Sequence, residues 1–463
     1  MPKLSIVASF FLFALTILLL PYSIAVGNSK KPIVLISGPE TNDLLNKIGK
    51  PLLEAAGMMP DSVKFHVMLN PTLNAMALPS NDIIFNSGLL QRADSIDEVA
   101  GVMAHEIAHL SAGHHIKLAS EMKNVSLQTL LFGVMGVAAG AATGSGKLAQ
   151  ATMVGGTAMG QAKLLSGRRQ KETQSDRLAI HYMVKAGYDP HGLTAFMERI
   201  QIEQQGTPLP PPYLLSHPLS SSRVVEIRQM ANENRGKTIR PPQDNRPLKR
   251  VQAKLYAGTA QVPSIAINHF RILLKKDPDD FTSHYGLAVA LRYAGQLPES
   301  EAQLNYLLKK QPNDPYLFRE RGRTRMDWGR AALAEIDFRV ALKSRPKDKD
   351  LLYWLAFAMK EQEKYRPAGR ILRRLTIKYP KKPHYFYLLG MVEGKGGKPA
   401  AGHLALGRHY ALILDVKTAL WHFDESIRLY PANTIEHTIA TREKERLLEQ
   451  IRKAKEKNWF KSL

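Results

Sequence analysis

The spacing of apolar residues changes along the chain and divides it into three regions. Residues 4–20 are continuously apolar, and residues 99–103 begin a helix-like apolar face behind a capping Ser95 or Asp97. From about residue 250 onward, small and aromatic residues recur at a long, regular interval instead. This pattern predicts an N-terminal apolar segment, a compact domain and a repetitive helical region.

Prolines show the length of the repeat. They stand 34 residues apart, at Pro278, Pro312, Pro346 and Pro380. A 34-residue period is that of the tetratricopeptide repeat, in which helix pairs bury small and aromatic residues by stacking on their neighbours. Independent helices with incidental prolines are the alternative, which three equal intervals disfavour. The next such proline, Pro431, comes 51 residues after Pro380. We therefore predict an extra helix over 383–397 and five to six helical units in total.

Composition predicts where the regions meet. The stretch around Arg240-Pro241-Pro242 is polar and Pro-rich, cannot bury much surface and is typical of a linker. We expect a first folded domain over residues 26–235, a linker over 236–250 and the repeat domain over 251–463. The length of 463 residues lets each folded domain bury its own core.

The N-terminus is typical of a secretory signal peptide. Lys3 precedes the apolar run, and Ser23-Ile24-Ala25 has small residues at alternate positions, as a cleavage site requires. The prediction is a signal peptide over 1–25, and an uncleaved anchor is the alternative because the run is about seventeen residues long. The chain has no cysteine, which excludes disulfides and is compatible with an oxidising compartment.

A second apolar stretch, residues 127–165, is rich in Gly and Ala and is broken by the polar Gly144-Ser145-Gly146-Lys147. Each half is short for a membrane span, and the break is typical of a turn between helices. We predict a hydrophobic hairpin that covers a cleft or rests on a membrane surface, with a transmembrane pair as the alternative.

Charge is concentrated in the repeat region. The formal net charge is +23, and about +18 of it lies from Pro247 onward. Acidic partners or anionic lipid head groups would suit such a surface, although solvated helix faces explain many of these charges equally well. The sequence has no phosphate-cradling Gly-rich loop and no interleaving of aromatic and basic residues, so nucleic acid is not an expected partner.

The chemistry-bearing motif is His105-Glu106-Ile107-Ala108-His109. Residues four apart lie on one face of a helix, so both imidazoles can bind one metal ion while Glu106 serves as general base. A catalytic zinc needs a third protein ligand, for which Glu172 is the candidate, and Asp176, one turn later, can hydrogen-bond a ligand histidine. A buried structural histidine pair and ordinary surface carboxylates are the alternatives. His114 and His115 are expected at a helix end or on the surface, because a five-residue step turns away from the metal face.

Several stretches resemble the gluzincin peptidases of the CAAX prenyl protease and HtpX type. Glu172-Thr173-Gln174-Ser175-Asp176 is similar to their E-x-x-A-D motif, with Ser in place of Ala. Asn74-Ala75-Met76-Ala77-Leu78-Pro79 is similar to their N-A-F-A-L-P strand, although Ser80-Asn81 replaces the usual Gly-Gly. Ser216-His217-Pro218 with Arg223 is similar to their S-H-P…R segment. In periplasmic BepA-like members this histidine can approach and shield the zinc, which makes His217 a candidate fourth ligand or switch.

The resemblance implies a mostly α chain with a small α+β protease domain: a zincin-like metallopeptidase fold followed by an α-solenoid of tetratricopeptide repeats. It implies one Zn²⁺ held by His105, His109 and Glu172, with Asp176 and Arg223 supporting the ligands. We expect substrate to extend along the strand at Asn74, Ala75, Met76 and Ala77, while His217 and Tyr213 are the candidates for oxyanion stabilisation.

The same resemblance implies a periplasmic endopeptidase that cleaves misfolded or stalled outer-membrane proteins. The expected partners are unfolded or outer-membrane protein clients, the outer-membrane assembly machinery through the repeats, and a membrane surface in peripheral contact. The alternative is a chaperone or scaffold whose zinc is structural or latent.

Overall fold

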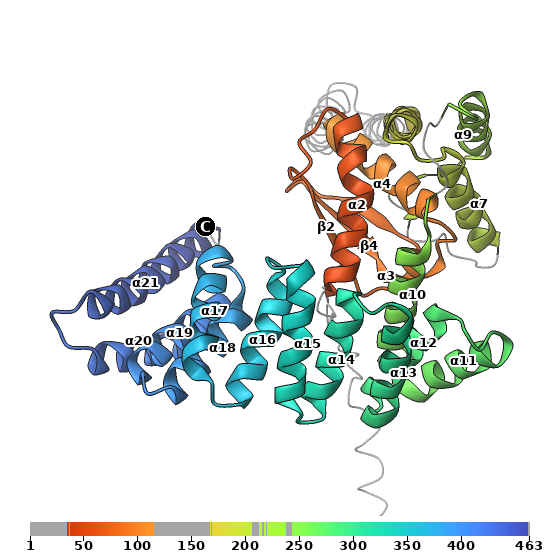
Figure 1. Ribbon diagram of the computed structural model, residues 1–463. Helices are drawn as coiled ribbons and strands as arrows, with labels where there is room; N and C mark the ends of the chain where they lie inside the picture. Colours follow the sequence, from red (N-terminus) through yellow and green to blue (C-terminus); the bar gives the residue numbers. More distant parts are fainter. Residues whose placement is uncertain are drawn as a thin grey trace, which may run out of the picture. The chain divides into compact units, whose positions relative to one another are not determined.

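A computed structural model of the chain describes residues 35–36, 38–114, 167, 169–205, 213–214, 217–218, 220–237 and 243–461 (Figure 1). The predicted signal peptide and the predicted hairpin over 127–165 lie outside these residues. Within the described part, no helix is both long and apolar enough to cross a membrane.

The N-terminal region combines a small sheet with helices. Its strands are β1 (Leu35–Ile36), β2 (Lys64–Met68), β3 (Ala75–Ala77) and β4 (Asp82–Asn86). Its helices are α2 (Pro39–Ala55), α3 (Ser87–Arg92), α4 (Ile96–Ser111), a helix over 169–186, α7 (His191–Gln205) and α9 (Ser221–Glu233).

The sheet is mixed and has the order β1-β2-β4-β3. β2 pairs in parallel with β4, whereas β1 and β3 pair antiparallel with their neighbours. Phe65, Val67, Ile83 and Phe85 alternate along β2 and β4 and are buried. α2 packs tightly on this layer: an ideal Cβ on Gly49 would lie 2.3 Å from the Phe65 ring. β3 is left at the edge of the described sheet.

Helix α4 carries the His105–His109 motif through the centre of this core. Ser95 caps its N-terminus by accepting a hydrogen bond from the Glu98 N–H at 3.1 Å. Gly101 lets α7 approach closely, because an ideal Cβ there would lie 2.6 Å from the Leu193 backbone nitrogen. The cap and α7 therefore hold the N-terminal half of α4, which leads directly into the motif.

The C-terminal region consists of helices throughout. They are α10 (Arg246–Thr259), α11 (Pro263–Lys276), α12 (Phe281–Tyr293), α13 (Leu297–Lys310), α14 (Pro315–Asp327), α15 (Ala331–Ser344), α16 (Lys349–Glu361), α17 (Tyr365–Lys378), α18 (Pro383–Lys395), α19 (Pro399–Leu412), α20 (Val416–Leu429) and α21 (Ile435–Lys461). The fold is thus mostly helical with a small mixed sheet, as the sequence predicts.

Recurrent contacts within the helix pairs reveal the repeat. Gly322 receives the ring of Phe338, and Gly407 receives the ring of Phe423; an ideal Cβ on either glycine would lie 2.6 Å from that ring. Each phenylalanine is sixteen residues after its glycine. Helices α12, α14, α16 and α18 begin 34 residues apart, at residues 281, 315, 349 and 383, and Gly390 of α18 meets Leu406 of α19, again sixteen residues later. α18 therefore continues the regular repeat, and the prediction of an extra helix over 383–397 was wrong.

Helix α10 begins inside the segment that the sequence assigns to a linker, 236–250. Its first residue is Arg246, and Pro247 follows in the first turn, where a missing N–H costs nothing. Gln252 donates to the carbonyl oxygens of Leu90 and Ala93 at 2.9 and 2.6 Å, so α10 is bound to the N-terminal region. Residues 246–250 of the predicted linker are therefore helical.

Candidate metal centre

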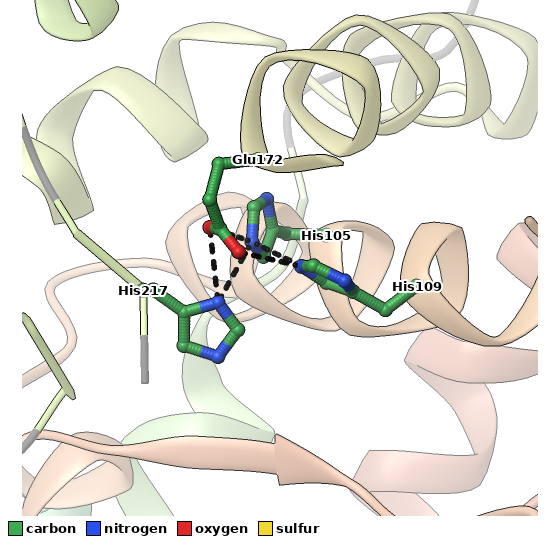
Figure 2. A group of neighbouring side chains, drawn as sticks. All are labelled: His105, His109, Glu172 and His217. Atoms are coloured by element: carbon green, nitrogen blue, oxygen red, sulfur yellow. Dashed lines mark hydrogen bonds and ion pairs between the residues drawn. The ribbon is translucent and has the colours of Figure 1, made fainter. Parts of the chain in front are cut away.

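Four side chains from three separate segments converge beside α4. His105 and His109 come from α4, Glu172 comes from the helix over 169–186, and His217 comes from the segment before α9. Figure 2 shows their donor atoms pointing toward a common point. These atoms lie within 4.8 Å of one another, and His105, Glu172 and His217 are buried. Among the described residues, these four side chains are the one group that could hold a metal ion.

The spacing of the donor atoms fits a tetrahedral metal ion. His105 Nε2 lies 3.1 Å from His109 Nε2 and 3.3 Å from His217 Nδ1. The Glu172 carboxylate lies 3.3 Å from His105 Nε2, 3.4 Å from His109 Nε2 and 3.1 Å from His217 Nδ1. Zinc–nitrogen distances of about 2.0–2.1 Å would place tetrahedral donors about 3.3 Å apart. These five separations are therefore close to those between the ligands of one tetrahedral ion.

His105 is oriented from behind by a buried carboxylate. Its Nδ1 lies 3.0 Å from Asp176 Oδ1. Arg223 holds Asp176 with two hydrogen bonds, from Nε at 2.8 Å and Nη2 at 2.9 Å. Burial alone would lower the pKa of His105, but the carboxylates of Asp176 and Glu172 outweigh it and raise that pKa to about 10. The surroundings of His105 thus favour a positive charge at this point.

His109 has a different partner, one that helical spacing does not indicate. His114 is buried, with its Nδ1 3.1 Å from His109 Nδ1 and its Nε2 3.2 Å from Gln174 Oε1. His114 lies at the end of α4, one of its two predicted positions, but it is buried and not on the surface; His115 lies outside the described residues. Gly113 adopts a φ of +65° just after α4 and turns the chain back, so the helical step no longer applies. Burial and the charge of His105 lower the pKa of His109 to about 2.

His217 is held on both sides. Its ring stacks on that of buried Tyr213, with centroids 4.6 Å apart and an interplanar angle of 23°. Its Nε2 lies 3.4 Å from Glu106 Oε1, while its Nδ1 faces Glu172. Arg223 also donates to the carbonyl oxygen of Pro218 at 2.6 Å. The same arginine therefore contacts both the His217 segment and Asp176, which orients His105.

Glu106 is placed between the donor cluster and the sheet edge. The backbone N–H of Ala77 donates to Glu106 Oε2 at 2.9 Å. The other oxygen, Oε1, is directed toward His217 and the cluster. Sequence motifs did not indicate this backbone contact, because it joins a strand and a helix through atoms that every residue type has.

The balance of buried charge calls for a divalent cation. Three carboxylates, Glu106, Glu172 and Asp176, are at most 4% exposed, and so is one permanent cation, Arg223. Uncompensated charges are costly inside a protein. With the ligand histidines neutral, as metal binding requires, a dication would neutralise the two remaining negative charges, so the residues present fit a metal ion in charge.

Known families match both regions of the chain. The family model described as peptidase family M48 matches residues 39–231, and the tetratricopeptide repeat model matches residues 251–315 and 285–349. The beta-barrel assembly-enhancing protease of Yersinia pestis is 24% identical over 372 residues, which cover 78% of this chain and 74% of that protein.

Two further relatives are similar over shorter stretches. The beta-barrel assembly-enhancing protease of Escherichia coli (strain K12) is 26% identical over 285 residues, 61% of this chain and 57% of that protein. The mitochondrial metalloendopeptidase OMA1 of Schizosaccharomyces pombe is 28% identical over 191 residues, 41% of this chain and 52% of that protein. The chain therefore matches only about half of the length of these two relatives. Residues 39–231 therefore carry both the match to peptidase family M48 and the histidine–glutamate cluster, and tetratricopeptide repeats follow them.

Proposed function

We propose that the chain is a zinc-dependent endopeptidase in which His105, His109 and Glu172 hold the metal ion and Glu106 is the general base. The observation that carries this proposal is the convergence of the four donor side chains within 4.8 Å, with the Glu106 carboxylate directly beside them. Two imidazoles and one carboxylate are the ligand set of thermolysin-type zinc sites. When bound, zinc lowers the pKa of a coordinated water to about 7 and polarises a carbonyl group.

The protein's own groups move the proton. The Ala77 N–H holds one oxygen of Glu106, so the other stays directed at the cluster, where it can accept a proton from the attacking water. Glu106 then donates that proton to the leaving amine. Asp176 and Arg223 act behind His105: they hold its ring so that Nε2 remains directed at the metal position.

The edge strand β3 supplies a surface for an extended substrate. Asn74 O and Leu78 N bond to β4, which turns the backbone groups of Ala75 and Ala77 away from the sheet. These outward groups lie beside Glu106, as the Ala77 contact requires. A substrate that adds a strand here would place its backbone next to the general base and would need little sequence specificity.

Removal of the metal tests the proposal. After dialysis against a chelator, the purified chain is expected to lose casein cleavage, because no group among His105, His109 and Glu172 can replace the Lewis acid. Restoring about one zinc per chain is expected to restore cleavage. Zinc content and casein hydrolysis are measured on the same samples. Undiminished hydrolysis by zinc-depleted chain contradicts a zinc-dependent mechanism.

The position of His217 favours a latent resting state and gives the chaperone or scaffold alternative its support. With its Nδ1 3.1 Å from Glu172 and 3.3 Å from His105 Nε2, His217 would complete a four-ligand site and leave no open position. We propose that His217 is a reversible fourth ligand, which water and substrate displace.

His217→Ala is expected to retain zinc on three ligands and to cleave casein about 3–10-fold faster than the parent. The rate rises because the variant cannot form the closed state, in which His217 occupies the fourth ligand position. Initial rates and zinc content provide the measurement. Slower cleavage with zinc retained would assign His217 to catalysis rather than gating. His191→Ala, which changes a half-exposed histidine paired with Asp189, is the matched control and is expected to leave the rate unchanged.

The names of the relatives suggest the substrates. Because two of them are beta-barrel assembly-enhancing proteases, we propose that this chain cleaves misfolded or stalled outer-membrane proteins in the periplasm. The catalytic unit would lie within residues 26–235, and the repeats from residue 251 onward would recruit clients and the assembly machinery. Export would rely on the signal-like segment 1–25, cleaved or retained as an anchor.

A further inference from the structure

Helix α17 differs in charge from the corresponding helices of the two preceding repeats. α13 and α15 each carry two basic and two acidic residues. α17 carries five basic residues and no acidic one: Arg366, Arg370, Arg373, Arg374 and Lys378. Because the 34-residue repeat gives these helices similar packing tasks, packing alone does not explain the concentration of positive charge on α17.

The five basic side chains share the exposed face of α17, which lies between α16 and α18 in the stack (Figure 1). At about 100° per residue they cover an arc of about 140°, opposite the buried Ala368, Leu372 and Leu375. Arg373 forms an ion pair with Glu393. Within the described part of the chain, the other four cations have no carboxylate partner.

The surface continues beyond α17. Lys395 and Lys398 are exposed at the turn between α18 and α19. This turn packs beside the start of α17, since an ideal Cβ on Gly396 would lie 2.9 Å from Tyr365 Cβ. The positive charge therefore extends sideways from the helix.

An aliphatic side chain stands in the middle of this face. Ile377 is 81% exposed and, by helical spacing, lies between Arg370 and Arg373 on the arc. A single exposed isoleucine is common on protein surfaces. On a face where four of five cations have no carboxylate partner among the described residues, however, it gives the composition of a surface that faces anionic head groups with hydrocarbon beneath them.

We infer that the α17 basic face, meaning Arg366, Arg370, Arg373, Arg374 and Lys378 around Ile377, docks on a membrane surface that carries anionic phospholipids. Guanidinium groups bind phosphate through paired hydrogen bonds, and four of the five cations are arginines. The cations form a row along one helix, while Ile377 also lines a hollow that residues of α21 border. Such a row suits a plane of laterally mobile head groups better than it suits one acidic protein.

Vesicle binding by the full chain tests the inference. Co-sedimentation with equal parts phosphatidylglycerol and phosphatidylcholine is compared with pure phosphatidylcholine, because the difference cancels any contribution from the apolar residues 4–20. The triple variant R366Q/R370Q/R374Q is expected to bind the anionic vesicles about 100-fold more weakly, at about fivefold per cation. Binding by the parent is expected to fall steeply with added salt.

The matched control removes the same charge elsewhere. K275Q/K276Q/K309Q changes three exposed lysines on α11 and α13 and is expected to stay within about threefold of the parent. I377S is expected to weaken anionic-vesicle binding about fivefold, by loss of the apolar contact. Equal binding to anionic and neutral vesicles overturns the inference. An equal loss in the control also overturns it, because net charge alone would then be responsible.

Discussion

Glu106→Gln is expected to keep the metal and to lower casein cleavage by about 10³-fold or more. The amide has the same shape and can still be held beside the Ala77 backbone, where Glu106 now accepts a 2.9 Å hydrogen bond. It cannot accept a proton, and proton transfer by a positioned group contributes about 10²–10⁴-fold. The two imidazoles and Glu172 are unchanged, so metal binding is expected to persist.

The measurement pairs zinc content with initial rates of casein hydrolysis at equal protein concentration. Glu54→Gln, the same substitution on the exposed surface of α2, is the control and is expected to match the parent. If Glu106→Gln cleaves casein as fast as the parent, Glu106 is not the base. Loss of zinc by this variant would instead indicate that Glu106 supports the ligands.

Glu172→Ala is expected to abolish cleavage by weakening metal binding at least about 100-fold, beyond the 10–100-fold effect of groups that merely support a ligand. The carboxylate lies within 3.4 Å of all three histidine donors, so its removal opens one corner of the site. Arg223 would also lose a neighbour, since its Nη1 lies 3.3 Å from Glu172 Oε2.

The three histidines could still gather around a metal ion after this change. The substitution is therefore repeated in the His217→Ala background, where only His105 and His109 remain. Competition with a zinc-binding dye measures the affinity, and Arg177→Ala, on the exposed side of the same helix, is the control. Unchanged zinc affinity in the double variant would exclude Glu172 as a ligand.

Features that depend on neighbouring residues were predictable from the sequence. The four-residue step from His105 to His109 places both rings on one face of α4, and Ser95 caps that helix as its position predicts. The tetratricopeptide region was predictable for a similar reason. Each repeat packs on its immediate neighbours, so the packing pattern recurs along the chain, and helices begin every 34 residues as far as α18.

Family resemblance supplied the candidates for the rest of the site. Glu172 was a candidate from its one-turn spacing to Asp176, and the family motif supported it, whereas His217 was proposed from its motif. His217 is 112 residues from His105, and no helical or strand period extends over that distance. The fold brings both side chains to α4. The Glu172→Ala and His217→Ala variants test what each contributes to metal binding.

The sequence by itself determined the helix with two histidines and an intervening glutamate, the repeat period and the uneven charge, because each follows from spacing or composition within one segment. Only the tertiary structure decided that His114 lies behind His109, that Arg223 reaches Asp176 and the His217 segment, and that the Ala77 N–H holds Glu106. The physical reason is that these contacts depend on how separate elements pack. A left-handed Gly113 or an edge strand beside α4 changes which groups meet without leaving a periodic signal in the chain.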